Sequence, residues 1–348
     1  MSDRPPLLFH VGAHKTGTTA MQAMLAALRP DLRVRGIAYP DLRPWTRGSE
    51  ADHNALAHLV ADEGPRAVWR RWKARRGLRR SAGLDRTVLS AEAVVRHVLG
   101  QGVSRSPEAW FPAHAAYLAR LAGFLRDFEV SALLYLRQPD TAVISMFKEN
   151  VVRGMPDGRR DLAGFIAAKA ARFDYPREIA TLSAAFPRLD VLSYEAEAKT
   201  GLLTGLLARI GAADLAPPRL PDLRTSPGNR ATLWLQRALG QVGEAEYRHR
   251  ALFCLRPEAA EVFDEAERST LWPSATVFAD FVAAHQATYA LPFLTRPEPP
   301  ALPCTRWDAA DHARADAAFA GWRQAHAALL AERDRRRLRH YDPDPALP

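Results

Sequence analysis

The chain has 348 residues, of which 47% are hydrophobic and 25% are charged, and its formal net charge is +9. This length can bury a large core, and it suits one large domain or a domain with a helical extension. The cysteines are only Cys254 and Cys304, which excludes a disulfide framework and a cysteine-based zinc cluster and favours a reducing compartment.

The sequence lacks the patterns of a secretory or membrane protein. Residues Met1–Pro6 do not have the pattern of a signal peptide, and no stretch approaches the roughly 20 apolar residues of a membrane span. We therefore expect a cytoplasmic protein without a transmembrane segment. The positive charge favours anionic ligands, although charge alone is weak evidence for any one partner.

The first predicted element is a short buried strand, Leu7–Val11, which leads into a glycine-containing loop and then into a helix from Thr18. Gly12 and Gly17 allow a sharp turn that brings backbone N–H groups close to a ligand. The helix N-terminus favours an anion, and Lys15 adds a cation. The predicted phosphate-binding residues are Gly12, Ala13, His14, Lys15, Thr16, Gly17, Thr18 and Thr19.

This loop differs from the ordinary ATP or GTP loop. The nucleotide-binding pattern Gly-x-x-x-x-Gly-Lys-Ser/Thr has its lysine after the second glycine. Here Lys15 precedes Gly17, and position 18 is Thr18. The alternative is a glycine-containing turn with a threonine cap and a solvated lysine.

A basic run follows at Arg66–Arg80. It contains eight basic residues, and Trp69 and Trp72 lie between them. One interpretation is a docking face for an anionic glycan or lipid headgroup, and a nucleic-acid patch would look similar. The other interpretation, which we favour from the sequence, is a solvated helix with two buried tryptophans.

Four later segments are predicted as buried strands because they are short, apolar and flanked by helical patterns. They are Val34–Tyr39, Arg86–Ser90, Val130–Leu136 and Leu189–Tyr194. Strands that alternate with helices indicate a parallel sheet, in which ligands bind at the carboxyl ends of the strands. Gly12, Ser90, Arg137 and Glu195 fall at such ends and are expected to converge.

The segment after the third of these strands is a second candidate for phosphate binding. The strand delivers Arg137 at its end, Pro139 and Asp140 begin a helix, and Ser145 lies two turns along it. Arg137 is suited to hold a phosphate with its two-pronged guanidinium, and Ser145 to add a hydroxyl contact. Alternatively, Arg137 pairs with Asp140, and Ser145 is a small packing residue.

The character of the chain changes after Gly211, where a proline-containing connector precedes helical patterns that start at Ala231. We predict a core at 1–215 and a mainly helical extension at 216–348 that packs on it. A separate helical domain and a single domain overall are the alternatives.

These motifs resemble the PAPS-dependent sulfotransferases, above all the bacterial carbohydrate-type members. His10–Thr19 with Gln22 is similar to the family's 5′-phosphosulfate loop, His-x-Gly-x-x-Lys-Thr-Gly-Thr-Thr. Tyr135–Pro139 with Ser145 is similar to its 3′-phosphate motif, with glutamine where asparagine or aspartate is more usual.

Two further segments extend the resemblance, which covers residues 7–211 in order, and a later loop matches it only by position. Leu89–Glu92 resembles the family's strand that ends in Ser-Ser-Glu, and Val191–Glu195 resembles its later strand with Tyr-Glu. Arg224–Asn229 occupies the place of a loop that closes over the 3′-phosphate, without matching its residues closely.

The resemblance implies a P-loop-type three-layer α/β fold and transfer of a sulfuryl group from 3′-phosphoadenosine 5′-phosphosulfate (PAPS), leaving the bisphosphate PAP. Lys15 would neutralise charge at the leaving phosphate, and Arg137 and Ser145 would hold the 3′-phosphate. Glu92 would be the general base, with His53 as a second candidate. No metal is required, because a sulfuryl group carries less charge than a phosphoryl group.

The expected acceptor is a hydroxyl or amine of a carbohydrate, a glycolipid or another small molecule, including anionic ones. Nucleic acid is not expected as a partner, and the sequence does not define the oligomeric state. Two alternatives remain open: a P-loop kinase or NTPase with a variant loop, and a non-catalytic nucleotide-binding protein on the same fold. A kinase or NTPase would need a lysine after Gly17 and a metal-binding acid.

Overall fold

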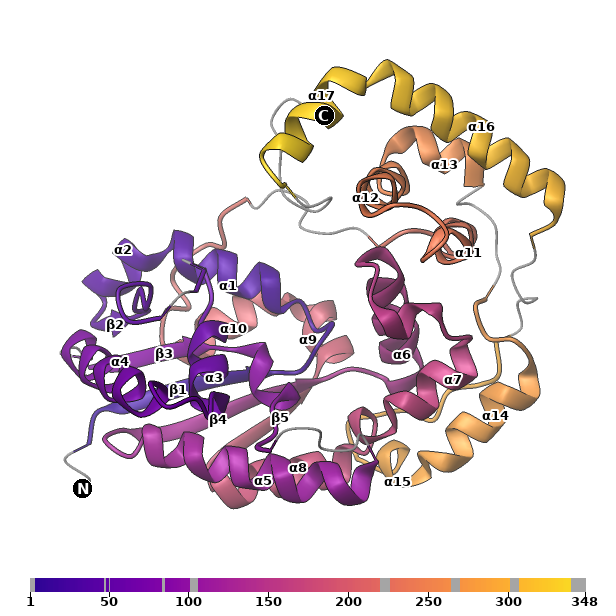
Figure 1. The fold of residues 1–348 in the computed structure, drawn as a ribbon. Coiled ribbons are helices and arrows are strands. Elements are labelled where there is room, and N and C mark those ends of the chain that lie inside the picture. Colours follow the sequence, from indigo (N-terminus) through magenta and orange to yellow (C-terminus); the bar gives the residue numbers. More distant parts are fainter. Residues whose placement is uncertain are drawn as a thin grey trace. The chain divides into compact units, whose positions relative to one another are not determined.

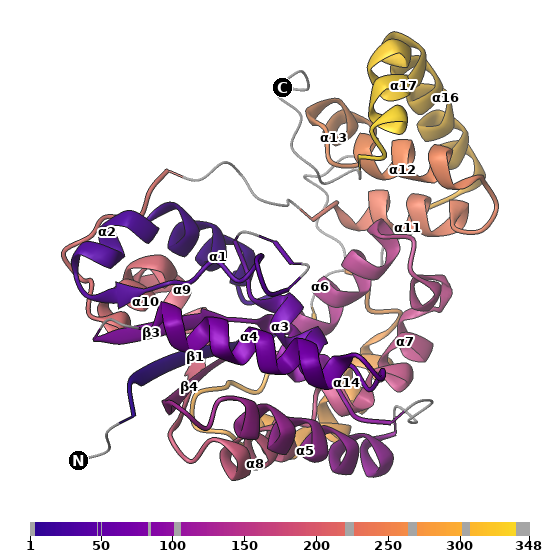
Figure 2. The same cartoon turned by 60° about the vertical axis from the view of Figure 1, so that its left-hand side comes forward.

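The computed structural model describes residues 4–46, 48–49, 51–82, 85–100, 106–219, 226–263, 270–300 and 307–338. The chain forms two units, shown in Figure 1 and, turned, in Figure 2. The first comprises Met1–Ala142, Lys169–Leu223 and His285–Arg296, and the second comprises Val143–Ala168, Arg224–Ala284 and Pro297–Pro348.

The first unit contains a five-stranded, all-parallel sheet in the order β2-β3-β1-β4-β5. Its strands are β1 (Pro6–Gly12), β2 (Ile37–Ala38), β3 (Arg86–Ser90), β4 (Glu129–Leu136) and β5 (Leu189–Ser193). The predicted α/β fold with a parallel sheet is confirmed. The β1 loop therefore lies between the carboxyl ends of β3 and β4, where open parallel sheets bind ligands.

Two strand boundaries differ from the prediction. Val34 is the last residue of helix α2 (Arg29–Val34), and Gly36 turns the chain with φ of +71° before β2 begins. At the other edge, Tyr194 begins helix α9 (Tyr194–Thr200), because the Ser193 hydroxyl accepts the N–H of Ala196 and caps that helix.

Side-chain alternation along the strands produces two apolar layers, one on each face of the sheet. Phe9 of β1 and Leu134 of β4 pack in one layer with helices α3, α4, α5 and α8. Leu133 and Tyr135 pack in the other with α1, α2 and α10. In Figure 1, α1, α2 and α10 lie above the sheet, and α5 and α8 lie below it.

Eleven helical segments lie within the described part of the first unit, and a twelfth helix leaves it. They are α1 (Thr18–Ala27), α2, α3 (Asn54–Ala61), α4 (Ala67–Ser81), η1 (Glu92–Arg96), α5 (Pro107–Phe124), η3 (Ala170–Arg172), α8 (Tyr175–Ala185), α9, α10 (Leu202–Ile210) and α15 (Gln286–Tyr289). Helix α6 (Pro139–Val152) begins in the first unit and continues into the second.

The second unit is helical in its described residues, as predicted for the C-terminal region. Its helices are η2 (Pro156–Arg159), α7 (Leu162–Ala168), α11 (Asn229–Ala238), α12 (Glu244–Phe253), α13 (Pro257–Phe263), α14 (Ala275–Ala284), α16 (Ala309–Ala325) and α17 (Ala327–Arg335). Trp234, Phe253, Phe263 and Phe319 form its aromatic core, with ring centroids 5.5–6.1 Å apart.

Each of the two units is built from segments that are separate in the sequence. Val143–Ala168 joins the second unit, whereas His285–Arg296 returns to the first, where the Thr288 hydroxyl donates to the Phe173 carbonyl at 2.8 Å. The division at residue 215 stays a prediction. No helix in the described part of the chain is both long and apolar enough to cross a membrane.

Candidate functional site

The loop after β1 turns at two glycines with positive φ, where other residues would be strained. Gly12 has φ of +115°, and a Cβ there would lie 3.3 Å from the Cα of Glu92. Gly17 has φ of +74°, and a Cβ there would lie 2.6 Å from a methyl carbon of Leu202. Lys15 adopts a left-handed conformation with φ of +65°. The backbone conformation therefore favours glycine at both positions, and at Gly12 the nearby backbone of Glu92 adds to this preference.

Hydrogen bonds fix the loop from its two ends. The Ala13 N–H donates to the Tyr135 carbonyl of β4 at 2.8 Å, and the buried Thr16 hydroxyl donates to the Ala13 carbonyl at 2.7 Å. His14, Lys15 and Thr19 are partly exposed at the loop surface. At the end of the loop, the backbone N–H groups of Gly17, Thr18 and Thr19 donate to no group among the described residues. The loop thus presents a row of donors at the start of α1.

Glu92 lies beside this loop, at the start of η1. The Thr18 hydroxyl donates to its carboxylate. The Ala91 N–H donates to the His10 carbonyl at 2.9 Å, and the Asn54 side-chain oxygen accepts the N–H of Ala93 at 2.9 Å. These contacts hold a partly exposed carboxylate at the edge of the predicted phosphate-binding loop.

Arg137 reaches the same loop from the end of β4. Its Nη1 donates to the Lys15 carbonyl at 3.2 Å, and its Nε donates to the Thr141 hydroxyl at 3.0 Å. Its guanidinium lies over the Tyr194 ring, 5.4 Å from the centroid. Glu195 Oε1 lies 4.0 Å from Arg137 Nε. The strand ends predicted to converge therefore do so.

Asp140 is not the partner of Arg137, contrary to one sequence interpretation. The Tyr289 hydroxyl donates to Asp140 Oδ1 at 3.3 Å, and burial raises the pKa of this carboxyl. Sequence reasoning also missed Tyr175, whose hydroxyl donates to the Arg137 carbonyl at 2.9 Å. Neither tyrosine carries a local sequence signal, since each reaches the site only through tertiary packing.

Ser145 lies on α6, beyond the point at which the chain passes from the first unit to the second, between Ala142 and Val143. Its predicted contact with a phosphate stays a prediction. The loop Arg224–Asn229, which the resemblance places over the 3′-phosphate, begins outside the described residues. Cys304 also lies outside them.

His10 and His53 are buried and both contact Ser90 at the end of β3. His53 Nδ1 accepts the Ser90 N–H at 2.9 Å, so its Nε2 carries the proton and donates to the Pro40 carbonyl at 2.8 Å. His10 Nδ1 lies 2.8 Å from the Ser90 hydroxyl. Burial lowers the pKa of each ring to about 4. Both nitrogens of His53 bind backbone groups, which suits a role in positioning Ser90, and its part as a second candidate base stays a prediction.

These two histidines predict a loss of stability in mild acid. Their folded-state pKa values lie below the unfolded value of 6.5, so between pH 6.5 and about 4 the unfolded chain binds more protons. Stability is complete above pH 6.5 and falls as the pH drops through this window, by up to about 3 kcal/mol for each ring. Urea unfolding at several pH values should show this slope, to which His97, with a pKa lowered to about 3, also contributes, and His53→Gln should reduce the slope by the share of one ring. An unchanged slope in the variant would contradict the assignment.

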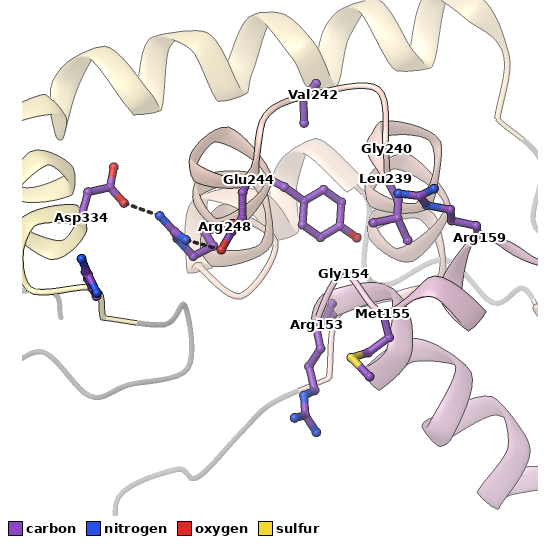
Figure 3. A pocket seen from close by; sticks show the side chains of 13 residues that line it. Arg153, Gly154, Met155, Arg159, Leu239, Gly240, Val242, Glu244, Arg248 and Asp334 are labelled. Atoms are coloured by element: carbon purple, nitrogen blue, oxygen red, sulfur yellow. Dashed lines mark hydrogen bonds and ion pairs between the residues drawn. The ribbon is translucent and has the colours of Figure 1, made fainter. Parts of the chain in front are cut away.

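The second unit contains a separate cavity of about 970 Å³, shown in Figure 3. Met155, Leu239 and the ring of Tyr247 form apolar parts of its wall. Arg248 donates to Glu244 at 2.7 Å and to Asp334 at 3.2 Å, and three further arginines, Arg153, Arg159 and Arg337, also line the cavity. We assign this cavity no part in the chemistry of the strand-end site.

Comparisons with known proteins leave the activity open. No family model and no curated protein matches this sequence. Among solved structures, the chain is similar to a sulfotransferase from Alicyclobacillus acidocaldarius, with a TM-score of 0.36 and 15% identity, over 71% of this chain and 100% of that one. At this identity and TM-score, the function has to be argued from the site residues themselves.

Proposed function

We propose that the protein is a sulfotransferase that moves a sulfuryl group from PAPS to a hydroxyl or amine of a carbohydrate, glycolipid or other small acceptor. The observation that carries this proposal is the contact between Arg137 and the Lys15 carbonyl. This contact joins the second cation, Arg137, to the loop that presents backbone donors. The Glu92 carboxylate lies at the same edge of the sheet, because it accepts the Thr18 hydroxyl of that loop.

The site residues fit a donor with an anionic group at each end. The N–H row of Gly17–Thr19 and the side chain of Lys15 suit the 5′-phosphosulfate, because helix N-termini and cations stabilise anions. Arg137 offers a guanidinium for the 3′-phosphate. We propose that these groups bind and orient the donor, with Ser145 contributing a hydroxyl.

The proposed reaction is an in-line displacement at sulfur. The acceptor oxygen forms a bond to sulfur while the bond between sulfur and the bridging oxygen breaks, and PAP leaves with that electron pair. Glu92 takes the acceptor proton, and Lys15 stabilises the charge that develops on the leaving phosphate. The carboxylate that now accepts the Thr18 hydroxyl is thus the proposed base.

Ligand-dependent melting separates this proposal from a kinase or NTPase. We expect PAP without magnesium, at about 100 times its dissociation constant, to raise the melting temperature by about 3–5 °C. ATP with magnesium should leave it unchanged. Stabilisation by ATP with magnesium and none by PAP would overturn the proposal.

Arg137→Ala should remove the preference for a nucleotide with a 3′-phosphate. Loss of a charge-assisted contact costs about 1.5–3 kcal/mol, so PAP should bind roughly 10–100-fold more weakly, while AMP binding changes little. Calorimetric titration of both nucleotides measures this difference. The matched control is Arg33→Ala, at an exposed position on α2. An equal loss for PAP and AMP would show that Arg137 supports the loop and does not recognise the 3′-phosphate.

A further inference from the structure

Helix α4 is the most basic element of the first unit and carries no acidic residue. Its basic residues are Arg70, Arg71, Lys73, Arg75, Arg76, Arg79 and Arg80. The sequence favoured a solvated helix whose two tryptophans are buried, and the structure corrects this. Trp69 is 60% exposed and Trp72 is 55% exposed.

The inner face of α4 carries three small residues and one leucine. Ala67, Ala74, Gly77 and Leu78 are buried. A Cβ at Gly77 would lie 2.2 Å from the ring of Trp45, so only glycine allows this close packing. The larger side chains, including both tryptophans, are consequently directed outwards. Figure 2 shows α4 at the front of the first unit.

The first half of the outer face is apolar. Val68, 68% exposed, adjoins the two indoles, and these are three of the five large hydrophobic side chains that are exposed in the described residues. The Lys73 ammonium lies 4.3 Å from the Trp69 ring centroid, and the Arg76 guanidinium lies 5.5 Å from that of Trp72. Neighbouring exposed apolar side chains on one helix face form a candidate interaction surface.

The second half of the face opens into a cationic cavity of about 560 Å³. Five arginines line it, together with Trp72 and one carboxylate, that of Asp127. Arg75 binds this carboxylate through two hydrogen bonds, one of 2.7 Å from its Nε. Among the described residues, Arg76 and Arg80 have no carboxylate partner. The cavity therefore retains cations for an outside anion.

We propose that this face of α4 docks on an anionic phospholipid surface, with lipid phosphates in the arginine cavity and Val68, Trp69 and Trp72 at the level of the headgroups. Indoles favour that interface, and basic residues next to them are attracted by acidic lipids. A nucleic acid or sulfated glycan would use the arginines and could stack on an indole. Neither offers an apolar phase for Val68, and a cation already lies over each indole. The proposal is independent of sulfuryl transfer.

Vesicle co-sedimentation of the full chain tests the proposal. We expect binding to phosphatidylcholine vesicles that contain about 30 mol% phosphatidylglycerol, and none to phosphatidylcholine alone. Raising the salt to about 0.3 M should weaken binding strongly, because screening shortens the range of surface charge. Equal binding to both vesicle types would overturn the proposal.

Two double variants separate the apolar and cationic contributions. Trp69→Ala with Trp72→Ala should weaken vesicle binding about tenfold or more. Arg76→Glu with Arg80→Glu should weaken it about twentyfold or more. The matched controls are Val34→Ala for the apolar pair and Arg33→Glu with Arg296→Glu for the charge reversal, all at exposed positions.

Folding and competing ligands are checked in the same preparations. All of these side chains are exposed, so melting temperatures should stay near that of the unsubstituted protein. Heparin, duplex DNA and inorganic phosphate serve as soluble anions. If the tryptophan variant keeps full vesicle binding, or if heparin or DNA binds more tightly than the acidic vesicles, the face is a soluble-polyanion site and the membrane proposal is wrong.

Discussion

Replacing Lys15 by methionine is expected to lower the rate constant for sulfuryl transfer by about a thousandfold. Methionine keeps the length of the side chain and removes its charge, so the developing charge on the leaving phosphate loses its closest proposed cation. The Arg137 contact is made to the Lys15 carbonyl, which the substitution retains. Donor binding should therefore weaken much less than turnover, by about tenfold.

Transfer of radiolabelled sulfate from PAPS to a panel of glycans and lipids would measure this effect, with PAP titration as the binding readout. Lys199→Met is the matched control, because Lys199 is an exposed lysine near the end of α9. A variant at Lys15 that transfers sulfate within twofold of the normal rate would remove Lys15 from the proposed chemistry.

Replacing Glu92 by glutamine is expected to lower turnover by about 10²–10⁴-fold, the usual contribution of a positioned general base. Glutamine has the same shape, and its carbonyl oxygen can still accept the Thr18 hydroxyl, so the loop should keep its conformation. The melting shift produced by PAP should be unchanged. This combination distinguishes a lost base from a damaged donor site.

Glu108→Gln, at an exposed position in the first turn of α5, provides the matched control for Glu92. If Glu92→Gln retains full turnover with PAPS and an accepted glycan, the proton goes to another group. If it instead abolishes the PAP melting shift, Glu92 supports the loop and its assignment as a base fails.

Much of the sheet was predictable because its strands are short apolar runs separated by helical periodicity. The loop was predictable because Gly12 and Gly17 flank a fixed spacing and precede good helix formers. Such patterns are local, so they can be recognised without knowledge of the tertiary contacts that each segment makes. The same local reasoning placed Val34 in a strand, since it cannot weigh a valine's strand preference against the helix that Arg29–Val34 completes.

The role of His53 could not be predicted from the residues that surround it in the sequence. A histidine at position 53, before a helix, is compatible with a base, a ligand or a packed ring. Its hydrogen bonds to Ser90 and Pro40, which are distant in sequence, define its tautomer and leave neither nitrogen available. Tyr175 and Tyr289 are parallel cases, because each reaches the strand-end site from another part of the chain.

By itself, the sequence determined the parallel α/β architecture, because its strands alternate with helical segments. Spacing within short segments indicated the donor-rich loop with Lys15 and the strand end with Arg137, and the resemblance to the sulfotransferases implied Glu92. Tertiary structure decided which of these groups touch, as in the contacts of Thr18 with Glu92 and of Arg137 with the Lys15 carbonyl. It also decided which face of α4 is covered. Periodicity defines two faces of a helix, but only the close packing of Gly77 on Trp45 directs the tryptophans outwards.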